Sequence, residues 1–350
     1  MEPGLSGERG VTGRWRLGDE PVAAAPRPGW WWGLTFHLGP DLIFLALFSL
    51  TLGVLFAVYD GKFTFVQTSI VLPALFMFGL IAVSFAPRAR AIASGDAALR
   101  REFTAQSLHT TRDWLPLILI IFVYENFHDL TDLIRPTTVD ASLRALDEAL
   151  FGVEPALALE PYVRVWLSEY MTFAYALYFL YPAGCLIGLY VSRRFIEFRE
   201  VSLALSLTFY LGLLGYVLVP AVGPRFFMAA EFHTPLVGPL TSRLAAAWNA
   251  IETVKRDCFP SLHTALTTTS LIYLYRYRRA WRYGRLALLV CTPLIVSLWA
   301  STIYLRYHYG VDVLAGWALA LLVTQAAPRF IRRYYAVHLG RAPHVSLDEG

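Results

Sequence analysis

The chain has 350 residues, of which 56% are hydrophobic and 16% charged, and its formal net charge is +4. A mean hydropathy of +0.49 is too high for an ordinary soluble domain of this length. The composition therefore excludes a soluble globular protein and predicts an all-α, polytopic integral membrane protein.

The two ends of the chain differ from the rest in composition. Residues 1–34 are rich in glycine, proline and charged side chains, which predicts a disordered tail. The first apolar run begins too late and is too long to be the apolar region of a signal peptide. Residues 336–350 predict a second loose tail.

Between the tails, apolar windows predict about eight transmembrane helices, since a helix needs ~20 residues to cross a bilayer. Three of them form a predicted N-terminal unit of residues 35–125, and the others belong to a predicted catalytic core of residues 126–335. The third and sixth windows are short, and we expect both helices to continue into polar flanks. The predicted crossings are residues 41–59, 67–86, 114–126, 167–191, 203–222, 264–276, 284–304 and 309–328.

Arginine-rich segments set the orientation, because short loops rich in Lys and Arg stay in the cytoplasm. Such a segment follows every even-numbered crossing, at residues 88–101, 193–199, 276–285 and 329–333. This regular spacing indicates topology rather than nucleic-acid binding, the other interpretation of basic runs. Both termini are thus predicted in the cytoplasm, and the long loops 127–166 and 223–260 on the opposite side. The first loop has apolar residues at the spacing of an interfacial helix, namely Leu143, Leu146, Leu150 and Phe151.

Two polar clusters lie at the edges of apolar runs on that external face. They are residues 259–263 (Phe-Pro-Ser-Leu-His) and residues 304–312 (Tyr-Leu-Arg-Tyr-His-Tyr-Gly-Val-Asp). Two predicted crossings separate them, so the chain returns to the face from which it started. The residues 223–225 (Gly-Pro-Arg) end another crossing on the same face. The residues that we expect to meet there are Arg225, Ser261, His263, Arg306 and His308.

His308 and Asp312 are four residues apart, so on a helix they would share a face. The carboxylate would then hold one ring nitrogen while the other faces a substrate, as behind a histidine nucleophile or base. His263 would protonate the departing alkoxide. The other interpretation is structural, because histidines cap helix ends and a His/Asp pair at this spacing stabilises a helix. Two histidine clusters on one face favour the catalytic interpretation.

Three further residues are candidates for binding a phosphate group. Ser261 follows Pro260 at a predicted helix start, where a hydroxyl and free backbone N–H groups bind oxyanions. Arg225 and Arg306 would neutralise the remaining charge on the phosphoryl group. This scheme requires neither a metal nor a cofactor.

At these positions the chain resembles the type-2 phosphatidic-acid phosphatase superfamily, whose motifs read KxxxxxxRP, PSGH and SRxxxxxHxxxD. Residues 260–263 (Pro-Ser-Leu-His) match the second motif with Leu in place of Gly. The third is matched by residues 301–312, with Thr302 in place of Arg, and Arg306 would supply the missing guanidinium. The first motif is reduced to residues 223–225, without a Lys seven residues before Arg225.

The resemblance spans residues 146–327 and implies a six-helix membrane core that works as a metal-free phosphohistidine enzyme. It implies His308 as the nucleophile, His263 as the acid/base and Asp312 as the residue that orients His308. The pairing of Phe-Pro-Ser-Leu-His with Tyr-Leu-Arg-Tyr-His-Tyr-Gly-Val-Asp looks more like the branch that contains inositol phosphorylceramide synthase. Members of that branch move a phosphate-bearing head group between lipids.

A further polar segment, residues 125–132, precedes this core on the same predicted face. His128, Asp129 and Asp132 are candidates for head-group binding, since carboxylates accept hydrogen bonds from sugar or inositol hydroxyls. One alternative is a metal at His128 and Asp132, which are also four residues apart. The other alternative is a capped helix end with solvated carboxylates.

The cysteines indicate neither a disulfide framework nor a metal site. Cys185 and Cys291 lie inside apolar helices, where they behave as small hydrophobic residues. Cys258 stands alone beside the first polar cluster, and a catalytic thiol there is the alternative.

The sequence therefore predicts an enzyme that transfers a phosphoryl group or a phospho-head-group, inositol phosphate among the candidates, from a membrane lipid to a lipid hydroxyl. A lipid phosphatase with water as the acceptor remains open, since one phosphohistidine serves both reactions. A non-catalytic protein that binds or translocates lipid phosphates would share the arginines. The pair His308 and Asp312, together with His263, is surplus to binding, which favours the enzyme.

Overall fold

The computed structural model describes residues 30–59, 110–117, 119–120, 123–124, 128–244 and 256–339. Within these residues the regular elements are helices, and one isolated β-bridge pairs Ala221 with Asp257. The all-α prediction is thus confirmed. Most of both predicted tails and the whole predicted crossing 67–86 lie outside the described residues.

The described helices fall into long helices of a bundle and short helices that connect them. The first part of the chain has α1 (Trp30–Val58), α4 (His128–Ile134), α5 (Asp140–Phe151), α6 (Pro155–Leu159), η2 (Glu160–Tyr162) and α7 (Val165–Ala176). Next come η3 (Leu177–Phe179), α8 (Leu180–Val191), α9 (Phe195–Leu218), α10 (Pro224–Phe227) and η4 (Ala229–Glu231). The last are α12 (Leu262–Arg276), α13 (Gly284–Tyr304) and α14 (Gly310–Leu339). Residues 110–117 are also helical.

Five helical stretches of the described chain are long and apolar enough to cross a membrane. They are Leu38–Leu55, Val165–Val191, Phe195–Leu218, Gly284–Tyr304 and Gly310–Val337. The second of these consists of α7, η3 and α8 together. These stretches correspond to five of the eight predicted crossings, and they make the chain a polytopic integral membrane protein. The predicted crossing 114–126 is only partly described.

The predicted crossing 264–276 is α12, whose 15 residues are fewer than the ~20 that span a bilayer. This helix lies inside the bundle, where it packs against α8, α9, α13 and α14. Its buried face is rich in small hydroxyl side chains, such as Thr264, Thr267 and Ser270, which let neighbouring backbones approach closely. Thr269 also hydrogen-bonds Thr208 of α9 at 3.2 Å. Because α12 is enclosed by other helices, it need not be as apolar as they are.

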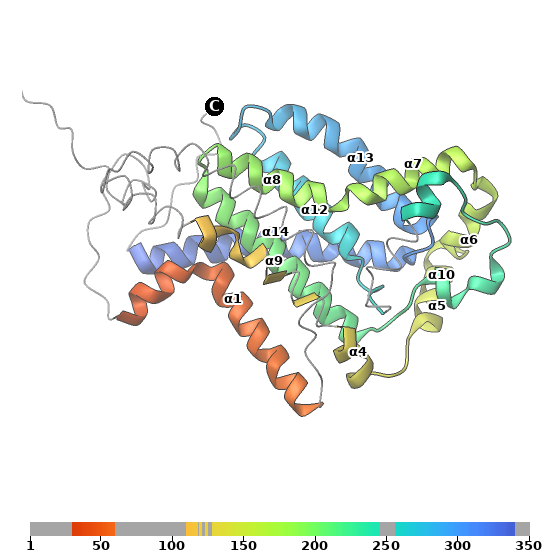
Figure 1. Cartoon of the computed structure of the whole chain (residues 1–350), viewed down its shortest axis with the longest axis horizontal. Coiled ribbons are helices and arrows are strands. Elements are labelled where there is room, and N and C mark those ends of the chain that lie inside the picture. Colours follow the sequence, from red (N-terminus) through yellow and green to blue (C-terminus); the bar gives the residue numbers. More distant parts are fainter. Residues whose placement is uncertain are drawn as a thin grey trace, which may run out of the picture.

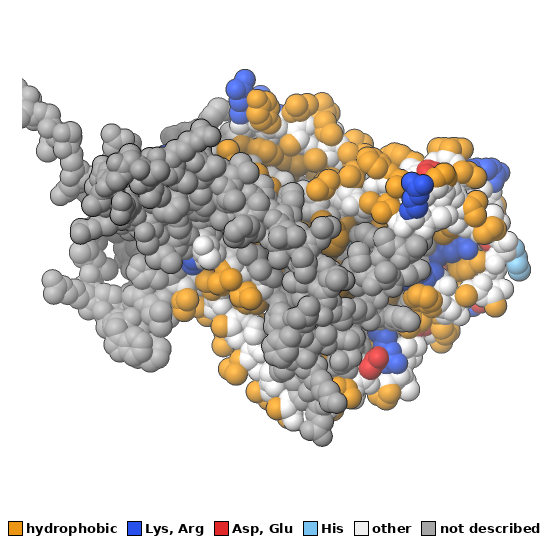
Figure 2. Space-filling view, in the orientation of Figure 1, with side chains coloured by type: hydrophobic (Ala, Val, Ile, Leu, Met, Phe, Trp, Pro, Cys, Tyr) orange, Lys and Arg blue, Asp and Glu red, His pale blue; other side chains and the backbone are white. Residues whose placement is uncertain are grey.

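The outer surface of the bundle is apolar. Large hydrophobic side chains are exposed on the long helices, for example Leu47 and Leu50 on α1, and Leu286 and Leu289 on α13. Figure 2 shows such side chains along the edge that α13 and α7 form. Exposed apolar side chains are expected on helices that face lipid.

The short helices α4, α5, α6 and α10 gather at one end of the bundle (Figure 1). The same end holds the start of α12 and the turn between α13 and α14. The helix predicted in the first loop is confirmed as α5, with Leu143 buried and Leu146, Leu150 and Phe151 exposed. The two predicted polar clusters therefore meet beneath a layer of short helices.

Candidate active site

His308 lies in the turn between α13 and α14, with 3% of its surface exposed. Its Nδ1 is 2.9 Å from the carbonyl oxygen of Cys258 and 3.4 Å from Asp312 Oδ2. A carbonyl oxygen only accepts hydrogen bonds, so Nδ1 carries the proton and donates it. In the neutral ring, Nε2 is then the unprotonated nitrogen with a lone pair for a substrate.

Asp312, in the first turn of α14, supports this arrangement. Its Oδ2 accepts hydrogen bonds from the Tyr309 N–H at 2.8 Å and the Cys258 thiol at 2.9 Å. The other oxygen, Oδ1, is buried and has no hydrogen-bond partner among the described residues. The carboxylate predicted to orient His308 is thus beside it. The shortest hydrogen bond of Nδ1, however, is donated to the backbone carbonyl oxygen of Cys258.

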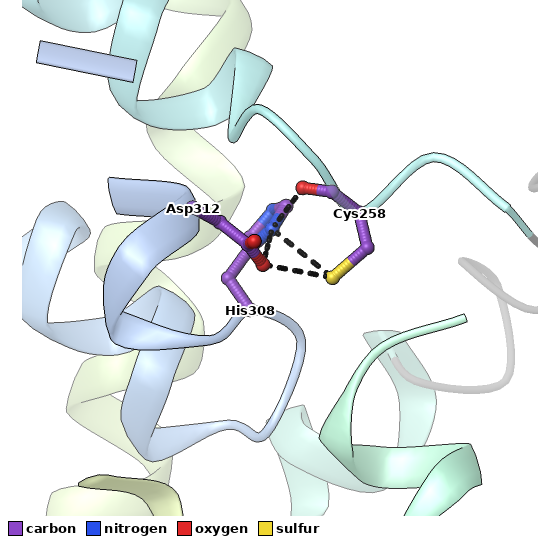
Figure 3. Close-up of side chains that lie close together, drawn as sticks. All are labelled: Cys258, His308 and Asp312. Carbon is purple, nitrogen blue, oxygen red and sulfur yellow. Dashed lines mark hydrogen bonds and ion pairs between the residues drawn. The ribbon is translucent and has the colours of Figure 1, made fainter. Parts of the chain in front are cut away.

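Cys258, His308 and Asp312 converge from two segments that lie far apart in the sequence (Figure 3). The Cys258 sulfur is 3.7 Å from His308 Nδ1. Burial and the Asp312 carboxylate raise the pKa of the Cys258 thiol well above its ordinary value, so the thiol is protonated and donates. The sequence predicts Cys258 as a lone thiol beside the first polar cluster, and its place two residues before Pro260 is the only signal for its presence here.

The same three side chains form the only cluster in the described part of the chain with three donor atoms placed for a metal ion, all within 4.8 Å. Thiolate, imidazole and carboxylate are ligands that Zn²⁺ takes. Here, however, the thiol proton binds Asp312 and the Nδ1 proton binds the Cys258 carbonyl. A metal would have to displace both protons, so the observed geometry is that of a hydrogen-bonded histidine.

His263 faces His308 from the first turn of α12. Its Nδ1 is 3.4 Å from His308 Nε2. The imidazole stacks on Tyr175 with ring centroids 4.5 Å apart, and the ring of Tyr178 is 4.4 Å away. Two tyrosines of one helical segment thus hold His263 in an orientation that directs a nitrogen to the His308 ring.

Ser261 begins α12 as its N-cap, and its Oγ accepts a hydrogen bond from the Thr264 N–H at 3.3 Å. The predicted helix start is therefore confirmed. Ser261 is fully buried, and its own N–H donates to the Asp312 carbonyl oxygen at 3.1 Å. Gly316 lets α14 approach the Ser261 carbonyl oxygen closely, because a Cβ at this position would lie 2.7 Å from that oxygen. Ser261 thus joins α12 to α14.

The two histidines and Arg225 line a small pocket of about 10 Å³. Gly223 has a φ of 82°, and a Cβ there would lie 2.5 Å from the Tyr307 carbonyl oxygen. The Arg225 N–H donates to the Arg306 carbonyl oxygen at 2.8 Å. The Arg225 guanidinium lies 4.4 Å from the ring centroids of Phe226 and Tyr307. The reduced first motif therefore places a guanidinium at the histidine pair.

A larger cavity of about 600 Å³ adjoins the small pocket. Four residues line both spaces, namely Tyr175, Arg225, Phe226 and Tyr307. Arg306 lines only the larger cavity, with a left-handed φ of 67°. Its guanidinium donates to the Thr234 carbonyl oxygen at 2.6 Å and is 3.4 Å from Glu160 Oε1. The two predicted phosphate-binding arginines thus occupy different places, and only Arg225 lines the pocket of the histidines.

A buried carboxylate that sequence analysis missed, Asp140, anchors the segment before Arg225. It accepts hydrogen bonds from the N–H groups of Val222 and Gly223 at 3.1 and 2.9 Å, and from the Tyr309 hydroxyl at 3.1 Å. Asp140 belongs to α5, so this helix connects the Arg225 segment to the turn that carries His308.

Asp147, one further buried carboxylate of α5, holds the start of α14. It accepts hydrogen bonds from the N–H groups of Gly310 and Val311 at 2.6 and 2.7 Å. Asp140, Leu143 and Asp147 share the buried face of α5. Acidic residues at helical spacing on the same face as an apolar residue were the signal that could have found them.

The predicted head-group residues belong to α4. Asp132 Oδ1 is 2.9 Å from Arg256 Nε, and the Asp132 side chain is 64% exposed. Asp132 lines neither of the two cavities. The side chains of His128 and Asp129 lie outside the described part of the structure. The structure thus places a surface ion pair at Asp132.

Comparison with known protein families bears on this arrangement. The family model of the PAP2 superfamily matches residues 141–326, which is more than half of the chain. The chain belongs to the PAP2 superfamily. No curated protein and no solved structure matches the chain. The matched region contains both histidines, Arg225 and Asp312.

Membership of the PAP2 superfamily confirms the resemblance to the type-2 phosphatidic-acid phosphatases at the level of the superfamily. Members of this superfamily are generally phosphatases or phosphotransferases. Together with the five apolar spans, this makes the chain an integral membrane enzyme of the lipid phosphatase or phosphotransferase type.

Proposed function

We propose that this PAP2 superfamily protein transfers a phosphoryl group or phospho-head-group from a membrane lipid to the hydroxyl of a second lipid, through a phosphohistidine at His308. The observation that carries the proposal is the opposition of two ring nitrogens beside Arg225. His308 Nε2 and His263 Nδ1 are 3.4 Å apart. A nucleophile and an acid/base must reach the same phosphorus and its ester oxygen.

In the first step, the lone pair of His308 Nε2 attacks phosphorus, and the bond between phosphorus and the ester oxygen of the donor lipid breaks. His263 gives its proton to the departing alkoxide. His308 Nδ1 keeps its proton, and Asp312 stabilises the positive charge that develops on the ring. In the second step, the acceptor hydroxyl gives its proton to His263 while its oxygen displaces Nε2 from phosphorus. Both histidines are then restored.

Arg225 is the candidate for neutralising the phosphoryl oxygens, since it lines the small pocket. A phosphoryl group is larger than a space of about 10 Å³, so substrate binding must widen this pocket. Arg225 lies over Phe226 and Tyr307 at the boundary with the larger cavity, and it is the side chain that would move.

The larger cavity supports transfer of a phospho-head-group, since it has room for far more than a bare phosphoryl group or a water molecule. A water molecule needs a space of only ~10–15 Å³, whereas about 600 Å³ is typical of sites for small organic molecules. The resemblance to the branch of inositol phosphorylceramide synthase supports the same reaction, with inositol phosphate as a candidate head group. Hydrolysis is the second candidate function, because the small pocket has about the volume of one water position.

The deciding experiment measures where the phosphorus of the donor lipid is transferred. Purified protein is incubated with a donor lipid labelled on phosphorus, with and without ceramide or diacylglycerol. We expect covalent label on the wild-type protein, no label on His308→Ala, and transfer of the label to the added lipid. Label in water-soluble products alone would favour the phosphatase. Equal labelling of His308→Ala would contradict the mechanism, and donor binding without any label would favour a non-catalytic lipid-phosphate binder.

We further propose that this site faces the non-cytoplasmic side and that both termini are cytoplasmic. The site lies where α12 begins, whereas the arginine-rich turn 276–285 follows the other end of the same helix. Such turns stay in the cytoplasm, which supports the opposite location for the site.

A further inference from the structure

The larger cavity is formed by a loop that two glutamates hold against neighbouring helices. Glu160 accepts hydrogen bonds from the backbone N–H groups of residues 233–234, both at 2.6 Å. The N–H of Thr234, aided by the one before it, lowers the pKa of Glu160 and keeps it ionised. Glu169 of α7 accepts hydrogen bonds from the backbone N–H groups of residues 240–241 at 3.0 and 2.8 Å. The loop is thus fixed at two points, which makes the cavity a defined part of the fold.

The lining of this cavity carries positive charge only. Arg225 and Arg306 line it, and none of its lining residues in the described chain is Asp or Glu. Much of the remaining wall is apolar, with Ala229, Phe232 and Leu236 among its residues. A ligand that enters therefore meets two guanidinium groups on the wall, while the neighbouring carboxylates lie behind Arg306, with Glu160 3.4 Å from its Nη2, and in the small pocket, at Asp257.

The aromatic rings of the cavity already hold cations. The Arg225 guanidinium lies 4.4 Å from the ring centroids of Phe226 and Tyr307, and that of Arg306 lies 4.0 Å from the ring centroid of Phe232. Aromatic cages bind quaternary ammonium groups through such ring faces. Here Phe226, Phe232 and Tyr307 each have a guanidinium on one face, and the remaining tyrosine of the wall, Tyr175, stacks with His263 and Tyr307. The cavity therefore does not provide an aromatic cage for a ligand cation.

We propose that this cavity binds the head group attached to the scissile phosphorus, and that it selects polyol or acidic head groups over amino-alcohol head groups such as choline or ethanolamine. The proposal rests on the proposed function and adds the chemical class of the substrate. Both hydrogen bonds that Arg306 makes to described residues come from Nη2. Its Nε and Nη1 are therefore donors for hydroxyl or phosphate oxygens. An ammonium group would be repelled by the two guanidinium groups on the wall.

The test measures binding without turnover. Full-length His308→Ala protein in detergent is titrated calorimetrically with glycerol phosphate, inositol phosphate, phosphocholine and phosphoethanolamine. We expect the first two to bind at least about tenfold more tightly than the last two. Because the readout is affinity, it does not depend on whether the wild-type protein transfers phosphorus to a lipid, to water or to neither. The failure of the proposed reaction would thus be distinguishable from the failure of this inference.

Three variants in the His308→Ala protein sharpen the test. Ala229→Glu places a carboxylate on the cavity wall, and Ala229→Gln adds a side chain of similar shape without charge. Ala230→Glu adds the same charge at the next exposed position, which does not line the cavity. We expect Ala229→Glu to reduce the preference for the anionic and polyol ligands about tenfold, while the other two variants change it less than threefold.

Two results would overturn the proposal. One is equal affinity for all four compounds, or no binding of any of them. The other is an effect of Ala230→Glu as large as that of Ala229→Glu, since the preference would then arise from the net charge of the protein. Thermal unfolding of each variant in the same detergent confirms that the protein measured is folded.

Discussion

The two ends of α9 both lie among buried charged side chains, but these charges are arranged in different ways. Near the start of the helix, Arg112 contacts Asp41 at 2.5 Å and Asp113 at 3.4 Å, and Arg199 is 3.0 Å from Asp113. This cluster of two guanidinium groups and two carboxylates joins α1, the helical residues 110–117 and α9. Each charge has an opposite charge in contact with it, and none of the four residues lines either cavity.

Beyond the other end of α9, which spans 24 residues or about 36 Å, the buried groups are only partly paired: His308 Nδ1 lies 3.4 Å from Asp312 Oδ2, but other atoms of the same side chains have no such contact. His308 Nε2 and His263 Nδ1 face each other beside a pocket, and Asp312 Oδ1 has no hydrogen-bond partner among the described residues. In Figure 1 the short helices α5, α6 and α10 lie beyond the end of α9, whereas α1 packs alongside α9. Ionisable residues in a membrane bundle suggest function by default. The two ends differ in that the compensated cluster of Arg112, Asp113, Asp41 and Arg199 joins helices, whereas the site directs a lone pair and hydrogen-bond donors into a pocket.

Removal of either histidine is expected to have the largest effect on rate. His308→Ala removes the nucleophile and His263→Ala the acid/base, so each should lower kcat by roughly 10²–10⁴-fold or more without changing thermal unfolding. Turnover of a labelled lipid per mole of folded protein measures this. Asp312→Asn should cost less, because His308 keeps its bond to the carbonyl of Cys258. Retention of more than a tenth of wild-type activity in both histidine variants would contradict the mechanism.

Substitutions in the cluster of Arg112, Asp113, Asp41 and Arg199 should lower stability and leave the rate unchanged. Asp113→Ala leaves buried Arg199 without the carboxylate that it contacts at 3.0 Å, and breaking such a pair costs about 3–5 kcal/mol. Thermal unfolding in detergent should show this loss, while activity per mole of folded protein stays unchanged. Glu148→Ala is the control, because this carboxylate is exposed, its partner Arg144 is half-buried, and such a surface pair contributes at most about 1 kcal/mol. A fall in kcat of the folded Asp113→Ala protein would contradict a purely structural role for this cluster.

A smaller effect on rate is expected when Asp147 of α5, which holds the start of α14, is replaced. In Asp147→Asn the amide NH₂ would face one of the two N–H donors, of Gly310 or Val311, and the start of α14 would shift. We expect kcat to fall about tenfold with KM little changed, since misplacement of a catalytic group by about 1 Å is costly, and a stability loss of about 1–3 kcal/mol. Asp132→Asn, at an exposed carboxylate, should change neither. An unchanged kcat for Asp147→Asn would show that α5 only stabilises the fold.

Chemical labelling should place the two ends on opposite sides of the membrane. In intact cells, Ala230→Cys should react with an impermeant thiol reagent, whereas Phe195→Cys and Ala280→Cys should react only after permeabilisation. Cys185 and Cys258 are buried, and replacing Cys291 with Ser removes the remaining background. Labelling of position 280 in place of position 230 would put the chemistry in the cytoplasm.

Chelation of divalent ions is expected to have no effect. Arg225 and the hydrogen-bonded His308 are assigned to the phosphoryl group and its transfer, so no metal clamp is needed. Activity in EDTA should therefore equal activity with added Mg²⁺. If EDTA abolished turnover and a divalent ion restored it, the mechanism would be wrong. Loss of that restoration in Cys258→Ser would then identify the cluster of Cys258, His308 and Asp312 as the metal site.

Much of the site could be predicted from local patterns. The contact between His308 and Asp312 and the N-cap at Ser261 follow from spacings of a few residues. The meeting of His263 with His308, 45 residues apart, follows from counting two crossings between them. The sixth predicted helix was harder, because the threonines of α12 lower the hydropathy of a helix that other helices shield from lipid.

The sequence by itself determined the all-α membrane architecture and pointed to the residues proposed for the chemistry, because apolar windows, caps and short motifs are local properties of the chain. Only the tertiary structure decided how those residues are supported. The carbonyl of Cys258 reaches His308 across 50 residues, and Asp147 reaches Gly310 across 163. The division between Arg225 at the histidines and Arg306 in the cavity likewise depends on the positions of the long loops. Such contacts arise from the packing of distant segments, which no residue spacing encodes.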